Sequence, residues 1–181
     1  MSRFLVFISI IFMMTNFQVR AEVSLGDLGL TESEVKLTPK QVQDQKILEQ
    51  RHGMLKTHEV LGLTTLGVMA AALFTGNSGL SSDTHMYLGM ASGVLYFTTA
   101  YYSFAAPKPA AIVDRGNIVW HKRLAWIHFP AMVLAPVLGY IYKKNEEDGK
   151  SSSSLVKQHS AVAGIGFGAF ALSAALMTIE F

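Results

Sequence analysis

Four histidines stand at or near the start of four separate apolar stretches of the chain: His58, His85, His121 and His159. An ionisable side chain at the edge of a lipid bilayer is costly, and such residues usually have a function. Imidazole nitrogen is a common ligand for zinc, copper and haem iron. One histidine at each of four stretches therefore indicates ligands for a metal or for haem.

Cysteine is absent from the sequence. Its absence excludes disulfides, iron–sulfur clusters, thiolate zinc sites and the covalent attachment of a c-type haem. If a metal is bound, histidine holds it. The formal net charge of +2 is too small, and the charges are too scattered, to indicate a nucleic-acid partner.

The four apolar stretches cover residues 60–75, 86–106, 124–142 and 160–179. A membrane-spanning helix needs about 20 mainly apolar residues, and the first stretch reaches this length only with its polar start near Lys56. Half of the chain is hydrophobic and only 15% is charged, which is typical of a small membrane protein. We therefore expect an all-α fold, an up-down bundle of four membrane-spanning helices.

Residues 1–21 have the features of a secretory signal peptide. Arg3 precedes a short apolar run at 4–14, and small residues flank a plausible cleavage point near Ala21. An uncleaved signal anchor is the alternative. Either interpretation places the following segment outside the cytoplasm, so we expect a multi-pass protein of the bacterial cytoplasmic membrane. Lysine and arginine are about equally frequent on both sides, so this orientation depends on the signal peptide alone.

Residues 22–52 are polar and mixed in charge. Within them, Thr38-Pro39 predicts a helix start, and residues 40–48 have a helix-forming composition. We expect a short extramembrane helix that continues into the first span. The remaining residues, 53–181, then form the four-helix transmembrane domain.

The same spacing recurs in every span: a histidine, a small residue four positions later, and usually another small residue three positions after that. Residues three and four apart share one face of a helix. Small residues on that face let membrane helices pack closely, and they also leave space for a flat ligand. The four predicted faces are His58, Gly62, Thr65, Met69 and Ala72; His85, Gly89, Ser92, Tyr96 and Thr99; His121, Ala125, His128, Met132 and Ala135; and His159, Ala163, Gly166, Phe170 and Ser173.

Aromatic residues and prolines modify two of the spans. Tyr96-Phe97, Tyr101-Tyr102 and Phe104 are typical of an interfacial belt and a lipid-facing surface. Pro130 and Pro136 should bend the third span, because each removes a backbone hydrogen bond.

Two further histidines leave alternatives open. On a helix His52 points about 120° away from His58, and an exposed polar residue is the favoured interpretation. His128 lies on almost the same face as His121 and about 10 Å deeper. Depth in the membrane favours His128 as the outer ligand, whereas the spacing to the next small residue favours His121. The residue that is not the ligand would then be a neighbour of the bound group.

The pattern resembles the four-helix core of the transmembrane cytochrome b-561 superfamily, in which four consecutive helices each carry such a histidine. Arg51-His52-Gly53-Met54-Leu55 is also similar to the His-Gly-x-Leu phrase of that family. The resemblance covers roughly residues 50–180. It implies two b-type haems, each held by histidines from alternate helices, and electron transfer across the bilayer. The flanking helices of the family are missing unless the N-terminal apolar segment is retained.

Carried over, the resemblance pairs His58 with His121 at the outer haem and His85 with His159 at the inner one, with His128 as the alternative to His121. Bundle geometry gives the same pairs, because the first and third spans run parallel, as do the second and fourth.

Two axial imidazoles leave the iron no open position, which favours electron transfer over oxygen chemistry. We expect an electron-transfer protein rather than a stand-alone enzyme, one that accepts electrons from a quinol or small reductant. It would pass them to a redox partner protein, in a respiratory or other redox chain, within a complex or a homo-oligomer. The alternative is a haem-free membrane anchor or assembly subunit, or a histidine-lined metal transporter.

Overall fold

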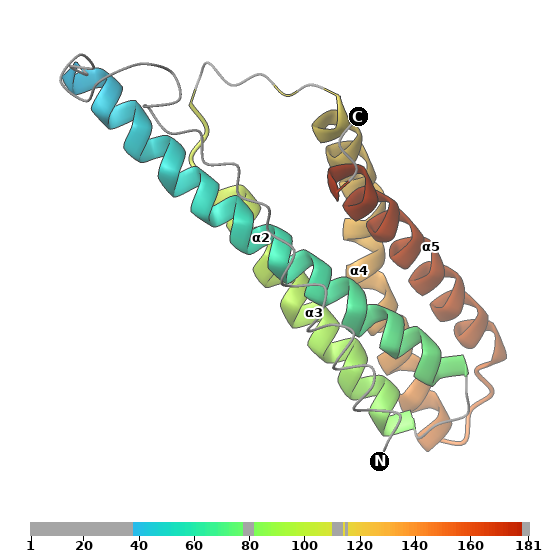
Figure 1. Cartoon of the computed structure of the whole chain (residues 1–181). Helices are drawn as coiled ribbons and strands as arrows, with labels where there is room; N and C mark the ends of the chain where they lie inside the picture. Colours follow the sequence, from blue (N-terminus) through green and yellow to red (C-terminus); the bar gives the residue numbers. More distant parts are fainter. Residues whose placement is uncertain (1–37, 78–81, 110–113, 115, 179–181) are drawn as a thin grey trace, which may run out of the picture. The chain divides into compact units, whose positions relative to one another are not determined.

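The computed structural model describes residues 38–77, 82–109, 114 and 116–178. These residues form four α-helices: α2 (Pro39–Asn77), α3 (Ser82–Ala105), α4 (Asn117–Glu147) and α5 (Ser153–Thr178) (Figure 1). The all-α class is therefore confirmed. The expected signal peptide and residues 22–37 of the polar segment after it lie outside the described residues.

The chain divides into two units, Met1–Lys46 and Ile47–Phe181. In the first unit the structure describes Thr38 and the first turns of α2. The contacts between helices reported below all lie within the second unit.

The start of α2 has a reciprocal cap. The backbone N–H of Thr38 donates to Gln41 Oε1 at 2.8 Å, and the backbone N–H of Gln41 donates to Thr38 Oγ1 at 3.4 Å. Pro39 occupies the first helical position, where its missing N–H costs nothing. The predicted start at Thr38-Pro39 is thus confirmed, and α2 continues for 39 residues into the first apolar stretch.

Among the described residues, three helices are long and apolar enough to cross a membrane: Pro39–Gly76, Asn117–Glu147 and Ser153–Thr178. At most 22% of the apolar window of each is buried inside the molecule. Their apolar side chains therefore face outward, as an integral membrane protein requires. The expected second span lies in α3, which is not one of these three helices; it contains many Tyr, Thr and Ser residues.

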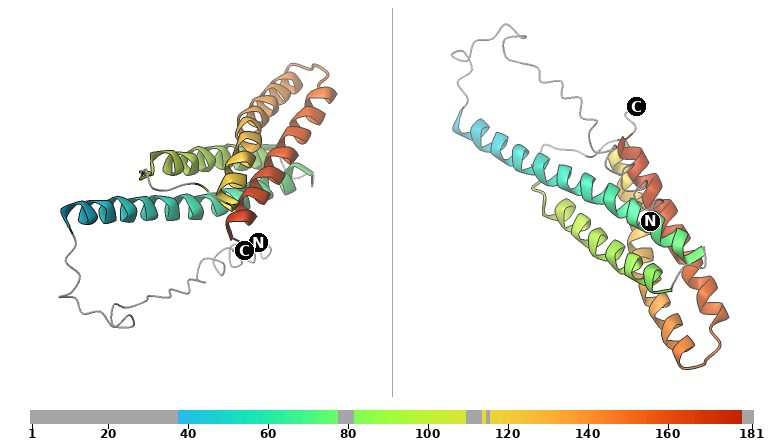
Figure 2. Two further views of the ribbon diagram at one scale, coloured as in Figure 1. Left: turned by 90° about the horizontal axis from the view of Figure 1, so that it is seen from above. Right: turned by 60° about the horizontal axis from the view of Figure 1, so that its bottom comes forward.

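Figures 1 and 2 show α2 beside α3 and α4 beside α5. Close approach of α4 and α5 occurs at Gly166, where an added Cβ would lie 2.8 Å from the Cβ of Ala131. The helix α4 remains continuous through Pro130 and Pro136.

Buried side chains gather on the predicted face of each helix. The core cluster takes one residue from every helix, each eleven positions after a histidine: Met69, Tyr96, Met132 and Phe170. The sequence analysis placed Tyr96 both on an inner helix face and in the aromatic, lipid-facing group. Tyr96 is buried in the core, so the lipid-facing interpretation is wrong for this residue. Its neighbours Phe97, Tyr101 and Phe104 are exposed, as that interpretation requires.

Candidate functional site

The structure brings the four histidines together as two pairs. The rings of His58 on α2 and His121 on α4 have centroids 6.0 Å apart and planes at 83°; we call them the 58/121 pair. The rings of His85 on α3 and His159 on α5 have centroids 5.8 Å apart and planes at 88°; these are the 85/159 pair. The 58/121 pair therefore joins α2 to α4, and the 85/159 pair joins α3 to α5.

All four rings are held in the same way by the neighbouring helix. A backbone carbonyl can only accept a hydrogen bond, so the ring nitrogen beside it, Nδ1, carries the proton. The other ring nitrogen, Nε2, then keeps its lone pair for a metal, which is the usual arrangement in metal-binding histidines. The four bonds from Nδ1 run from His58 to Thr99 O at 2.9 Å, from His85 to Ala72 O at 2.8 Å, from His121 to Ser173 O at 3.2 Å, and from His159 to Ala135 O at 2.8 Å.

These bonds follow a fixed register. Each accepting residue lies fourteen positions after the histidine of its own helix. The helices α2 and α3 each accept a hydrogen bond from the other's histidine, and so do α4 and α5. Fourteen residues of helix correspond to roughly 21 Å. The two histidine pairs are therefore separated by most of the roughly 30 Å thickness of a bilayer core.

The ring of His121 also contacts a serine hydroxyl. The Oγ of Ser173 lies 2.7 Å from Nδ1 of His121 and 3.4 Å from the carbonyl oxygen of His121. Nδ1–H can donate to this hydroxyl, which in turn donates to the carbonyl. Ser173 is completely buried, so the contact is shielded from water.

The donor set of each pair fits haem iron. In the described part of the chain no group of three or more His, Asp or Glu side chains is placed to hold a metal ion. Two imidazoles leave zinc short of its usual four ligands, whereas haem iron receives four nitrogens from the porphyrin and needs only two more. A metal–imidazole bond of about 2 Å, plus about 1 Å to the ring centre, places opposite imidazole centroids about 6 Å apart. The observed separations of 6.0 and 5.8 Å agree with this spacing.

His128 lies in the core and is not paired with His58. Its Nδ1 is 2.8 Å from the hydroxyl of Tyr96, and its ring centroid is 5.0 Å from that of Phe170. Among the described residues its buried Nε2 has no hydrogen-bond partner. If the Tyr96 hydroxyl donates to Nδ1, the proton of His128 is on Nε2, and this Nε2–H is the one unpaired group of the contact. If Nδ1–H donates to the hydroxyl instead, both Nε2 and the hydroxyl hydrogen of Tyr96 are unpaired. An Nε2 that carries a proton is not a metal ligand.

The two alternative outer ligands, His121 and His128, therefore have different neighbours. The structure places His121 beside His58, and it places His128 against Tyr96. His52 is exposed on α2, as the sequence suggested. The role of the two pairs as iron ligands stays a prediction.

Charged side chains form a small cluster just before α4. The carboxylate of Asp114 pairs with Lys108 at 3.0 Å and also with Lys122. Hydrogen bonds from Lys122 and Lys108 hold the pKa of Asp114 below its usual value near 3.8. The cluster ties the chain before α4 to the first turns of that helix, which carries His121.

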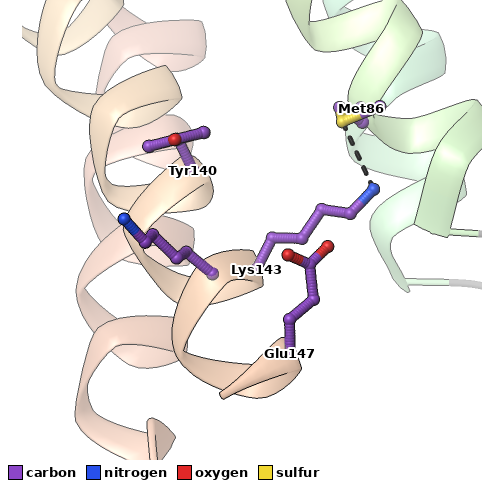
Figure 3. A pocket seen from close by; sticks show the side chains of 5 residues that line it. Met86, Tyr140, Lys143 and Glu147 are labelled. Atoms are coloured by element: carbon purple, nitrogen blue, oxygen red, sulfur yellow. Dashed lines mark hydrogen bonds between the residues drawn. The ribbon is translucent and has the colours of Figure 1, made fainter.

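A pocket of about 330 Å³ lies between α3 and α4. Met86, which follows His85, and Tyr140, which follows Gly139, both line it, together with Lys143, Lys144 and Glu147 (Figure 3). The ammonium of Lys143 lies 3.2 Å from Asp83 Oδ1 and 3.5 Å from Met86 Sδ, and it thereby joins α4 to α3.

Sequence reasoning missed the groups that hold the rings. Every residue has a carbonyl, so the sequence does not mark the four that accept from histidine. The fourteen-residue spacing has meaning only once these acceptors are known. The contact between Tyr96 and His128 was also missed, although both residues lie on predicted inner faces.

The resemblance to the transmembrane cytochrome b-561 superfamily depends on the histidines and the small residues alone. No protein-family model matches the chain, and neither a curated protein nor a solved structure matches it. Membership of that superfamily stays a prediction.

Proposed function

We propose that this protein is a membrane b-type cytochrome that relays electrons through two non-covalently bound haems. The 58/121 pair would hold one haem and the 85/159 pair the other. One observation carries the proposal: two facing histidine pairs with centroids 6.0 and 5.8 Å apart, in which every Nδ1 is bonded to a helix carbonyl. Haem with two axial imidazoles supplies one-electron transfer.

The proposal includes α3 as a fourth membrane span in an up-down bundle. The helix has 24 residues, which gives a length of about 36 Å, enough for a bilayer core of about 30 Å. Polar residues that lower its hydropathy, Ser92, Tyr96 and Thr99, are buried inside the protein. The lipid-facing side of α3 is therefore more apolar than its average composition.

The chain's own groups orient the ligands and exclude water. The carbonyl bonds fix the tautomer and the plane of each imidazole, and this leaves Nε2 available to iron. Between the two pairs, the core cluster of Met69, Tyr96, Met132 and Phe170 fills the interior with apolar and aromatic side chains. A buried, apolar surrounding of this kind is one of the means by which a protein sets a haem potential.

The expected signal peptide would place residues 22–52 and the 58/121 pair on the outer side of a bacterial cytoplasmic membrane. The 85/159 pair would then lie on the inner side. A quinol or small reductant is the proposed donor, and the pocket lined by Met86, the residue after His85 in the sequence, is the proposed place for it. A redox protein is the proposed acceptor, within a complex or a homo-oligomer.

Absorption spectroscopy tests the proposal. The full chain, expressed with ample haem and purified in detergent, should show the Soret band and the reduced α band of a b-type cytochrome. Acid acetone should extract about two haems per chain, because the chain has no cysteine to retain them. The His52→Ala variant is a matched control and should keep both haems. A preparation without a Soret band would support a haem-free anchor subunit or a metal transporter instead.

A further inference from the structure

Two glycines contact the rings of the 85/159 pair. A Cβ added at Gly76 of α2 would lie 3.0 Å from both Cε1 and Nδ1 of His85. A Cβ added at Gly139 of α4 would lie 3.1 Å from Cε1 and 3.3 Å from Nδ1 of His159. These separations are shorter than ordinary van der Waals contact, so a side chain at either position would push the ring away by a few tenths of an ångström.

The two glycines occupy equivalent positions. Gly76 follows Ala72 by four residues, and Gly139 follows Ala135 by four. Ala72 and Ala135 are the residues whose carbonyls accept from His85 and His159. In an α-helix the carbonyl of residue i also accepts from the N–H of residue i+4. At Ala72 and Ala135 the imidazole that reaches this carbonyl from a neighbouring helix passes close beside residue i+4, where an added Cβ would press against the ring.

The 58/121 pair lacks this arrangement. Its acceptors are Thr99 and Ser173, and the residues four positions later are Ser103 and Met177, which both have side chains. Among the other glycines in the described part of the chain, none would place an added Cβ within 4 Å of a histidine. An added Cβ at Gly89, Gly93, Gly164 or Gly168 would meet no described atom within 4 Å.

We infer that Gly76 and Gly139 are positioning residues that set the orientation of His85 and His159 as axial ligands. This inference rests on the proposed function. The close contact and the carbonyl bond together fix both the distance of each ring from its partner and the angle of 88° between the two planes. Loss of a group that orients a metal-binding histidine typically weakens metal binding by about 10- to 100-fold.

The test uses Gly76→Ala and Gly139→Ala in the full, haem-loaded chain. Each variant should change the ferric electron paramagnetic resonance (EPR) signal and the midpoint potential of one haem, that of the 85/159 pair, and should weaken its binding about 10- to 100-fold. The other haem should keep its signal and its potential, which also shows that the protein is folded. Gly164→Ala on the exposed side of α5 is the matched control and should change neither haem. Unchanged spectra, or an equal change at both haems, would overturn the inference.

A second measurement does not require haem. Nitrogen-15 spectra of the histidines in the haem-free protein report which ring nitrogen carries the proton. His159 should be protonated at Nδ1 in the wild-type chain and should lose this fixed tautomer in Gly139→Ala; an unchanged tautomer would overturn the inference. A wild-type chain that binds no haem would refute the proposed function, while the nitrogen spectra would still decide whether Gly139 positions the ring.

Discussion

The contact between Tyr96 and His128 gives a prediction about the free energy of unfolding. In the wild-type protein the tyrosine hydroxyl and Nδ1 of His128 satisfy each other, and one buried nitrogen, Nε2, is unpaired. Tyr96→Phe removes the hydroxyl and leaves both nitrogens of the imidazole unpaired. His128→Phe removes the unpaired Nε2 but leaves the hydroxyl of Tyr96 without a partner. The double variant leaves neither group unpaired.

The magnitudes follow from this count. Leaving one more buried polar group unpaired costs about 1–3 kcal/mol. Tyr96→Phe should therefore destabilise the protein by about 1 kcal/mol or somewhat more, because side-chain hydrogen bonds inside membrane proteins average only about 0.6 kcal/mol. His128→Phe exchanges one unpaired group for another and should change stability little. The double variant should be about as stable as the wild type or more stable, since phenylalanine keeps the ring contact with Phe170.

Equilibrium unfolding of the haem-free protein in detergent, with increasing sodium dodecyl sulfate and circular dichroism as the signal, measures all four free energies. Haem is left out so that its release does not contribute. A double variant that is destabilised by the sum of the two single effects would refute the reasoning, because it would mean that Tyr96 and His128 do not interact.

Three further predictions concern the histidine pairs and the charged cluster. His121→Ala should abolish the haem of the 58/121 pair in absorption and redox titrations, whereas His128→Ala should keep a low-spin haem there with a shifted potential; the reverse result would make His128 the ligand. His85→Ala and His159→Ala should each remove the same haem and leave the other, and equal loss of both haems would contradict the pairing. The pKa of Asp114 is lower in the folded protein than its usual value, so its ion pairs stabilise the fold above about pH 3.8, and this contribution is lost as the pH falls through the folded pKa. Thermal unfolding over a pH series should therefore be less pH-dependent in this acidic range for Asp114→Asn, and an identical dependence would show that the cluster is not involved.

Much of the helical arrangement could be predicted from the sequence, because helical periodicity requires that buried positions recur every three or four residues. Thr65, Ser92 and Phe170 were predicted on inner faces and are buried. The start of α2 could be predicted because Thr38 and Gln41 are close enough in sequence to cap each other.

Other features depend on which helix lies beside which, and a local pattern does not contain that information. The sequence left His121 and His128 as alternatives, because both lie on the inner face of the same helix. Only the neighbouring helices separate them: α2 presents His58 to His121, and α3 presents Tyr96 to His128. Gly139 gave no signal for the same reason, since it contacts a histidine of another helix.

The ferric EPR spectrum of the purified, haem-loaded protein tests the assignment of two bis-histidine sites most directly. The imidazole planes lie at 83° in the 58/121 pair and at 88° in the 85/159 pair. Nearly perpendicular axial imidazoles leave two iron d orbitals close in energy and give a strongly anisotropic low-spin signal, whereas parallel planes give a rhombic signal. Two strongly anisotropic low-spin signals are expected, one lost in His121→Ala and the other in His159→Ala. A high-spin spectrum, or rhombic signals from parallel rings, would contradict the assignment.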